Sequence, residues 1–175
     1  PLTGVLFNSS GSGLSNILWD FGDGASSIDT IAYHTYSNPG VYNVIITGQN
    51  NNGNQFSDTT IIEVFENPIA NFQLESINLA CTPYSAAFSD SSYAIGAASI
   101  VSSNWTFGDG ATLQSNNQAN VLHTYVTTGF FDVSLEVVDD NGCSDFMLLD
   151  SLLTISSPPN PSIFSNIQTV TDCDI

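Results

Sequence analysis

The chain has 175 residues, including 17 Asp and Glu and two His but no Lys or Arg, which gives a formal net charge of −17 at pH 7. This charge repels nucleic acid and anionic membranes, so we exclude nucleic acid as a partner and direct insertion into a membrane. With 42% hydrophobic and 11% aromatic residues, the chain can still build a packed core.

An internal repeat organises the chain. Residues 19–24 read Trp-Asp-Phe-Gly-Asp-Gly, and residues 105–110 read Trp-Thr-Phe-Gly-Asp-Gly. Farther along, His-Thr-Tyr at 34–36 recurs at 123–125, in the same order relative to the first motif. The period is therefore close to ninety residues. Phe72 to Cys81 and Phe164 to Cys173 both span nine residues, so a third copy begins near the C-terminus.

Each copy consists of short alternating runs divided by turn residues. In residues 131–137, Phe, Val, Leu and Val alternate with Asp, Ser and Glu, a pattern typical of a strand with one buried and one exposed face. Gly-Asp-Gly at 108–110 and Asn-Gly at 141–142 are turn signals. About seven strands with a central Trp indicate an immunoglobulin-like sandwich. The predicted fold class is all-β, with tandem sandwiches in a head-to-tail array.

The predicted domains follow the repeat. Residues 1–66 are expected to form a sandwich whose first strand is truncated, and residues 67–156 a second sandwich. Residues 157–175 are expected to supply a linker and the first hairpin of a third repeat. Pro1 starts within a strand-like pattern and not a signal peptide, so we expect a segment of a longer protein. Both linkers contain proline and are expected to be semi-rigid.

The ordered motifs Trp-Asp-Phe-Gly-Asp-Gly, His-Thr-Tyr and Pro-Gly-Val-Tyr-Asn-Val (39–44) resemble the PKD domain, a β-sandwich module of secreted and cell-surface proteins. The resemblance covers both repeats. Tandem modules with an Asn-Gly-Cys turn also resemble repeats of giant surface adhesins exported by type IX secretion. Thr106 and Phe131 depart from the pattern, which suggests that Asp20 and the Tyr42 hydroxyl are not indispensable to the fold.

The repeated motif residues are interpreted as structural, because each occurs at equivalent places in two separate units. Asp between glycines suits a tight turn, and His two residues before a strand Tyr suits a structural hydrogen bond. No catalytic constellation is recognised, so we predict that the chain is not an enzyme. The structural set is Trp19, Phe21, Asp23, Gly24, His34 and Tyr36 in the first repeat, and Trp105, Phe107, Asp109, Gly110, His123 and Tyr125 in the second.

Calcium is the one ligand that the composition favours, although no cofactor is expected to be required. Oxygen donors without competing cations suit a hard divalent ion, and the acids are 13 Asp against 4 Glu. The candidate ligands are Asp139, Asp140 and Asn141, in a loop expected to point toward the preceding repeat, together with Glu66. Against a site, the first repeat has only Asn at 50–52, and a solvated acidic turn explains the residues equally well.

Three cysteines in a secreted-type chain predict disulfides, with at least one partner outside the sequence. Cys81 and Cys143 form one candidate pair, although sandwich topology places them at opposite ends of the unit. The alternative joins neighbouring repeats: Cys143 would pair with a cysteine upstream of Pro1, and Cys81 with the third repeat. Cys173 is the third repeat's copy of Cys81. Both alternatives remain open from the sequence.

The predicted function is a non-catalytic, extracellular repeat segment of a long cell-surface adhesin or filament, acting as a stiff spacer or adhesive module. The alternative is an accessory array, with carbohydrate binding as one role, in a secreted hydrolase. A sugar-binding face needs a row of exposed aromatics, whereas both Trp residues lie on the inward alternation. Candidate partners are neighbouring repeats of the same chain, surface glycans and other cell-surface proteins.

Overall fold

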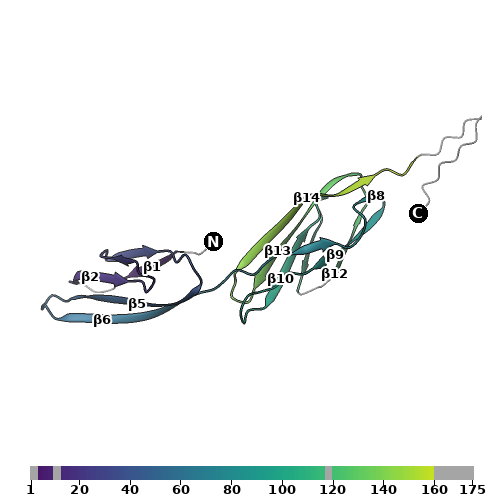
Figure 1. The fold of residues 1–175 in the computed structure, drawn as a ribbon. Coiled ribbons are helices and arrows are strands. Elements are labelled where there is room, and N and C mark those ends of the chain that lie inside the picture. Colours follow the sequence, from purple (N-terminus) through teal and green to yellow (C-terminus); the bar gives the residue numbers. More distant parts are fainter. Residues whose placement is uncertain (1–3, 10–12, 117–119, 160–175) are drawn as a thin grey trace, which may run out of the picture. The chain divides into compact units, whose positions relative to one another are not determined.

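The structure is a computed structural model that describes residues 4–9, 13–116 and 120–159. The chain divides into two compact units, Pro1–Glu66 and Asn67–Ile175 (Figure 1). All regular structure in the described ranges is β-strand, arranged as two immunoglobulin-like sandwiches in tandem, so the predicted fold class is confirmed. Among these residues no helix has the length and hydropathy needed to cross a membrane. The predicted third repeat lies mostly outside the described residues.

The first unit packs a four-stranded sheet, β3-β2-β5-β6, against a two-stranded sheet, β1-β4. The strands are β1 (Val5–Asn8), β2 (Ser15–Asp20), β3 (Ser26–Ser27), β4 (Ile31–His34), β5 (Gly40–Gln49) and β6 (Gln55–Val64). β5 and β6 pair without interruption along their whole length. Their connecting turn is closed by Asn50, whose Oδ1 accepts the backbone N–H groups of Asn52 and Asn54.

The second unit packs a five-stranded sheet, β11-β10-β13-β14-β8, against a three-stranded sheet, β12-β9-β7. The strands are β7 (Phe72–Leu74), β8 (Leu79–Cys81), β9 (Tyr84–Asp90), β10 (Ile100–Thr106), β11 (Thr112–Ser115), β12 (Asn120–Tyr125), β13 (Gly129–Asp139) and β14 (Ser144–Ser156). β8 pairs in parallel with the end of β14, whereas the other strand pairs are antiparallel.

Each unit has its own apolar core between its sheets. In β13 the inward residues Phe131, Val133, Leu135 and Val137 are buried as the alternation predicts. The core of the first unit consists of Phe7, Ile17, Trp19, Phe21, Ala32, Tyr36, Val44 and Ile46. The core of the second consists of Ala70, Phe72, Ala86, Phe88, Trp105, Phe107, Val121, Tyr125, Phe131, Val133, Leu135, Val137, Leu153 and Ile155. At about 25 cal/mol per Å² of buried apolar surface, these cores supply the main stabilising term of each unit.

The two glycines of the turn after β10 exclude a side chain for different reasons. Gly108 and Gly110 have φ of 81° and 94°, in the left-handed region. A Cβ on Gly108 would also meet the backbone oxygen of Asp132 at 2.5 Å, whereas one on Gly110 would meet nothing within 4 Å. Backbone strain therefore acts at both positions, and a steric clash acts only at Gly108.

We expect Gly110→Ala to lower the free energy of unfolding of the second unit by about 1–2 kcal/mol, from left-handed strain alone. Gly108→Ala should cost clearly more, because β13 must also shift. Urea unfolding followed by the fluorescence of Trp105, in a Trp19→Phe background, measures both. Equal costs at the two positions would show that the close approach to Asp132 carries no energy.

Candidate functional site

The motif turn after β10 places Asp109 at the edge of the sandwich. Phe107 N–H donates to the carbonyl of Ala111 (3.2 Å), and Asp109 Oδ1 accepts the N–H of Ala111 (3.0 Å). The side chain thereby closes its own turn, which leaves Oδ2 for a second partner. This is why a short acid stands between two glycines here.

His123 supplies that partner from the opposite sheet. Its Nε2 lies 2.8 Å from Asp109 Oδ2, and its ring stacks on Phe107 with centroids 4.1 Å apart and planes 8° apart. Because an ionised carboxylate only accepts, Nε2 carries the proton in this contact. Asp109 follows β10 and His123 lies on β12, so the pair joins the two sheets.

Tyr125 makes a second link between the sheets. Its hydroxyl donates to the carbonyl of Phe107 (3.0 Å) while its ring is fully buried and meets the edge of His123. Burial and, after it, the charge of Asp109 raise the pKa of Tyr125, so the hydroxyl stays protonated as a donor. We call Asp109, His123 and Tyr125 the Asp-His-Tyr cluster of the second unit.

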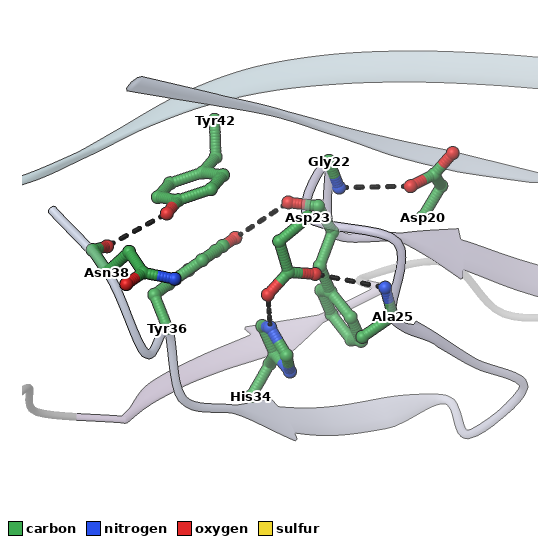
Figure 2. A network of polar contacts seen from close by, with 9 residues as sticks. Asp20, Gly22, Asp23, Ala25, His34, Tyr36, Asn38 and Tyr42 are labelled. Carbon is green, nitrogen blue, oxygen red and sulfur yellow. Dashed lines mark hydrogen bonds and ion pairs between the residues drawn. The ribbon is translucent and has the colours of Figure 1, made fainter. Parts of the chain in front are cut away.

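The first unit contains the same cluster in Asp23, His34 and Tyr36 (Figure 2). Asp23 Oδ1 accepts Ala25 N–H (3.0 Å) and its Oδ2 lies 2.7 Å from His34 Nε2. Tyr36 donates to the carbonyl of Phe21 (3.1 Å), and His34 stacks on the Phe21 ring with centroids 4.2 Å apart. All twelve motif residues therefore occupy equivalent places in the two units.

The positions at which the repeats differ lie outside these clusters. Asp20 is exposed and accepts the N–H of Gly22, whereas Thr106, its counterpart, shares a hydrogen bond with the Ser134 hydroxyl. Tyr42 donates its hydroxyl to the Asn38 carbonyl (2.8 Å), and Phe131 has no hydroxyl to donate. Both units form their sheets regardless of these differences.

The hydrogen bonds of the clusters lower the pKa of both aspartates. At Asp23 the backbone N–H of Ala25 is the largest cause, with His34 adding to it against a cost of burial. At Asp109 burial is the largest influence and would raise the pKa, but His123 and the Ala111 N–H together outweigh it. The ionised form of each acid is thus the one that holds the turn to the histidine.

The contacts of the clusters are structural, because they hold the motif turn of one sheet to the histidine of the other. In the described part of the chain, no hydroxyl or thiol side chain hydrogen-bonds to either histidine. Both Trp side chains are buried, and Trp19 Nε1 donates to the Asp29 carbonyl (3.0 Å). The arrangement positions one sheet on the other in each unit.

Among the proposed calcium ligands only Asp139 is buried, whereas Asp140, Asn141 and Glu66 are exposed. Asp139 is 1% exposed, and its Oδ1 accepts the N–H groups of Asn141 and Cys143 while its Oδ2 is buried without a hydrogen-bond partner among the described residues. Asp140 Oδ1 accepts the Ser99 N–H (3.1 Å). Glu66 is exposed at the end of the first unit.

An oxygen such as Asp139 Oδ2 suits a cation chemically. However, the described residues contain no group of three or more His, Cys, Asp or Glu arranged to hold a metal ion. The calcium site therefore stays a prediction.

The structure excludes one of the two disulfide alternatives. Cys81 lies opposite Ser156 at the end of β14, whereas Cys143 directly precedes Ser144 at its start. Twelve residues of extended strand separate these ends by about 40 Å, and a disulfide needs Cα atoms within about 7 Å. The pairing of Cys81 with Cys143 is therefore wrong, and neither cysteine forms a disulfide within the described residues. Cys173 lies outside the described residues, and the link between neighbouring repeats stays a prediction.

Two polar anchors in the second unit were not predicted from the sequence. Ser103, buried in β10, donates to Asp90 Oδ2 (2.9 Å), and Asp145 Oδ2 accepts the N–H of Ala70 (2.9 Å). Ser103 shares the inward alternation of Trp105 and Phe107, so a polar residue on a buried face was the available signal. Asp145 gave no signal, because its partner lies 75 residues away along the chain.

The Asp-His-Tyr clusters predict a specific acid sensitivity. A folded-state pKa below the ordinary 3.8 means that the contribution of Asp109 is fully present above about pH 4 and is lost as pH falls through the lowered pKa. We expect the free energy of unfolding of the second unit to decrease as the pH falls below about 4. Asp109→Asn should flatten that decrease in urea titrations at each pH.

Asp150→Asn is the matched control, because it removes the same charge from an exposed residue of β14. It should leave the decrease in place. If Asp109→Asn and Asp150→Asn flatten the decrease equally, the acid sensitivity comes from the overall negative charge and not from the Asp-His-Tyr cluster.

The calcium hypothesis has its own test. With no Lys or Arg, added sodium chloride should stabilise the chain by screening, since the screening length falls from about 30 Å at 0.01 M to about 8 Å at 0.15 M. A calcium site would add stabilisation beyond sodium at matched ionic strength. Changing Asp139 and Asp140 together to Asn, which imitates Asn50 and Asn51 of the first unit, should remove only that increment. Identical melting curves in the two salts would eliminate the site.

Among solved structures, the chain is similar to the PKD1 domain of Vibrio anguillarum Epp, with 26% identity, 54% of this chain and 99% of that chain covered, and a TM-score of 0.43. It is similar to the PKD1 domain of the Vibrio cholerae metalloprotease PrtV, with 28% identity, coverage of 53% and 100%, and a TM-score of 0.42. Clostridium thermocellum CbhA fibronectin(III)-like modules share 14% identity, with coverage of 87% and 86% and a TM-score of 0.44.

A family model for the PKD domain matches the chain twice, over residues 2–64 and 66–148. The two matches cover most of the chain, and each includes the Asp-His-Tyr cluster of one of the two sandwiches. This chain belongs to the PKD domain family.

Proposed function

We propose that the two domains of this chain act as a stiff spacer within a longer cell-surface protein of the adhesin or filament type. PKD domains are non-catalytic modules typical of secreted and extracellular bacterial proteins. The observation that supports this role is where the repeated residues lie. The motif side chains pack into the cores or join the two sheets. The two units therefore share a set of contacts that stabilise the fold, and not a surface site.

The exposed aromatic residues support the same proposal, because they do not repeat. Tyr33, Phe130 and Phe146 are exposed, but their counterparts 89 residues away are Leu122, Val41 and Ser57. A sugar-binding array needs aromatic rings presented at equivalent places. Carbohydrate binding in a secreted hydrolase therefore ranks below the spacer.

The short connection between the units also supports stiffness. β6 ends at Val64, and Ile69 already forms a β-bridge with Tyr93 inside the second unit. Only four residues remain between them, and one of these, Pro68, has a fixed φ and is buried. A connection of this length and composition belongs to the semi-rigid class of linkers.

Distances between spin labels test the stiffness. Labels at exposed Asn43 and Gln114, in a variant with all three cysteines changed to Ser, should give one narrow distance distribution by pulsed electron resonance. Insertion of Gly-Ser-Gly-Ser after Glu66 should broaden it severalfold, because a Gly/Ser linker behaves as a flexible coil. If the chain without the insertion is already as broad, it is a flexible tether and the spacer role is wrong.

A glycan array separates the spacer from the accessory role. The spacer predicts no selective binding. Saturable binding to one polysaccharide that is lost when Phe130 and Phe146 are changed to Ser would favour the accessory array.

A further inference from the structure

The larger sheet of the second unit has an edge strand that is only partly paired. β8 pairs with β14 at Thr154, Ile155 and Ser156. Between Ser144 and Leu149, β14 pairs with β13 on one side and with no other strand of residues 4–9, 13–116 and 120–159. An edge of this kind is a template for pairing with a strand of another chain.

The hydrogen bonds of the β13-β14 hairpin show which residues face this edge. The Asp139 N–H donates to the Cys143 carbonyl (2.9 Å), so these two residues form a hydrogen-bonded pair. Opposite residues of an antiparallel ladder alternate between hydrogen-bonded and non-hydrogen-bonded pairs, and this ladder runs without a shift as far as Leu149. The odd-numbered residues of β14 up to Leu149 therefore bond to β13. The N–H and C=O groups of Phe146 and Leu148 point away from β13, toward the free edge.

The same two residues present apolar side chains to solvent. Phe146 is 58% exposed and Leu148 is 47% exposed, whereas Met147 between them packs against the core. Edge strands are commonly protected by Lys, by Pro or by a bulge. Residues 144–149 contain neither Lys nor Pro, and the bulge of β14 comes only after Leu149. This stretch is therefore a regular, apolar and unprotected edge.

The first unit has a polar edge at the same place. The counterparts of residues 146–148, 89 positions earlier on β6, are Ser57, Asp58 and Thr59. A charged residue between two polar ones discourages pairing with another strand. The apolar edge is thus a property of the second unit and not of the repeat.

We propose that β14 pairs with β14 of a second copy of this chain, antiparallel and about a twofold axis at Met147. Phe146 and Leu148 are two residues apart, so this axis places each opposite the other in the partner, where they exchange the backbone hydrogen bonds that face the edge. Their side chains meet as a cross-strand pair, which the symmetry repeats. The larger sheets of the two copies thereby form one continuous sheet. The inference goes beyond the spacer role and does not depend on it.

The acids of the edge favour this register. It places Asp145 opposite Leu149 of the partner and Asp150 opposite Ser144 of the partner. Each acid is then at least about four residues along the strands, roughly 14 Å, from its own copy. That separation exceeds the screening length of about 8 Å at 0.15 M salt. A register with Phe146 opposite itself would bring the two copies of Asp145 to roughly 8 Å.

Dimerisation of the 175-residue chain tests the proposal. In reducing buffer at physiological salt, sedimentation velocity should show a concentration-dependent equilibrium between monomer and dimer. Phe146→Ser with Leu148→Thr copies the edge of the first unit and should weaken dimerisation about tenfold or more, because both cross-strand pairs are lost. Both residues are exposed, so the variant keeps its fold. An intact chain that stays monomeric up to its solubility limit overturns the proposal.

Phe130→Val is the matched control. Phe130 is 75% exposed on β13 of the same sheet, where the first unit has Val41, and its neighbour on β14 is Thr154. This change removes exposed aromatic surface but leaves residues 144–150 intact, so dimerisation should not change. Equal weakening by both variants would mean general apolar association and would overturn pairing through β14.

A single cysteine at the axis tests the register. With Cys81, Cys143 and Cys173 changed to Ser, Met147→Cys should form a disulfide-linked dimer on oxidation with copper phenanthroline. The reason is that position 147 and its copy form a non-hydrogen-bonded pair, with Cα atoms about 4.5 Å apart. Leu149→Cys, half-buried on the same strand, should link far less, because its copy lies roughly 14 Å away. A dimer that links through position 149 as readily as through 147, or through neither, overturns this pairing.

Discussion

The constraint on which this structure depends is that 17 acids must be accommodated without a single Lys or Arg. The structure does this largely with backbone N–H groups. Asp23, Asp109 and Asp139 each close a turn by accepting N–H groups, and Asp145 does the same across the second unit. Such bonds fix the chain where they form, because a backbone donor cannot move away as a long basic side chain can. The charge that repels partners therefore also shapes the turns.

The two histidines are the only cationic side chains available, and both are used in the same way. Each reaches from the smaller sheet to an Asp of the larger one, and stacks on the Phe between the Trp and that Asp. A Tyr hydroxyl two residues later binds the carbonyl of the same Phe. In each unit this Phe stacks on the His ring, and its carbonyl accepts the Tyr hydroxyl, so Phe21 and Phe107 lie among the contacts that join the two sheets near the motif turn. This shared arrangement accounts for the recurrence of the motif residues.

Much of this was readable from the sequence, because the signals are local. The alternation in residues 131–137 and the Gly-Asp-Gly turn each depend on neighbours along the chain, and they gave the fold class and the buried Trp, Phe and Tyr residues. The features that could not be predicted involve residues whose partners lie far away in the sequence. β8 is three residues long and pairs with a strand more than seventy residues later, and the ends of β14 separate Cys81 from Cys143. The sequence left Asp139 open between a solvated turn and a calcium ligand, and its burial depends on strands that its own sequence does not specify.

The motif residues and the short strand β7 have different roles in building the second unit. The motif strand, its turn and the His-Thr-Tyr strand lie close together in sequence and form the Asp-His-Tyr cluster in both units. β7 contributes only three residues to the sheet, yet its Phe72 covers the central Trp and Phe of the core. The apolar cover of the central Trp and Phe in the second unit therefore comes from a strand of three residues outside the motif.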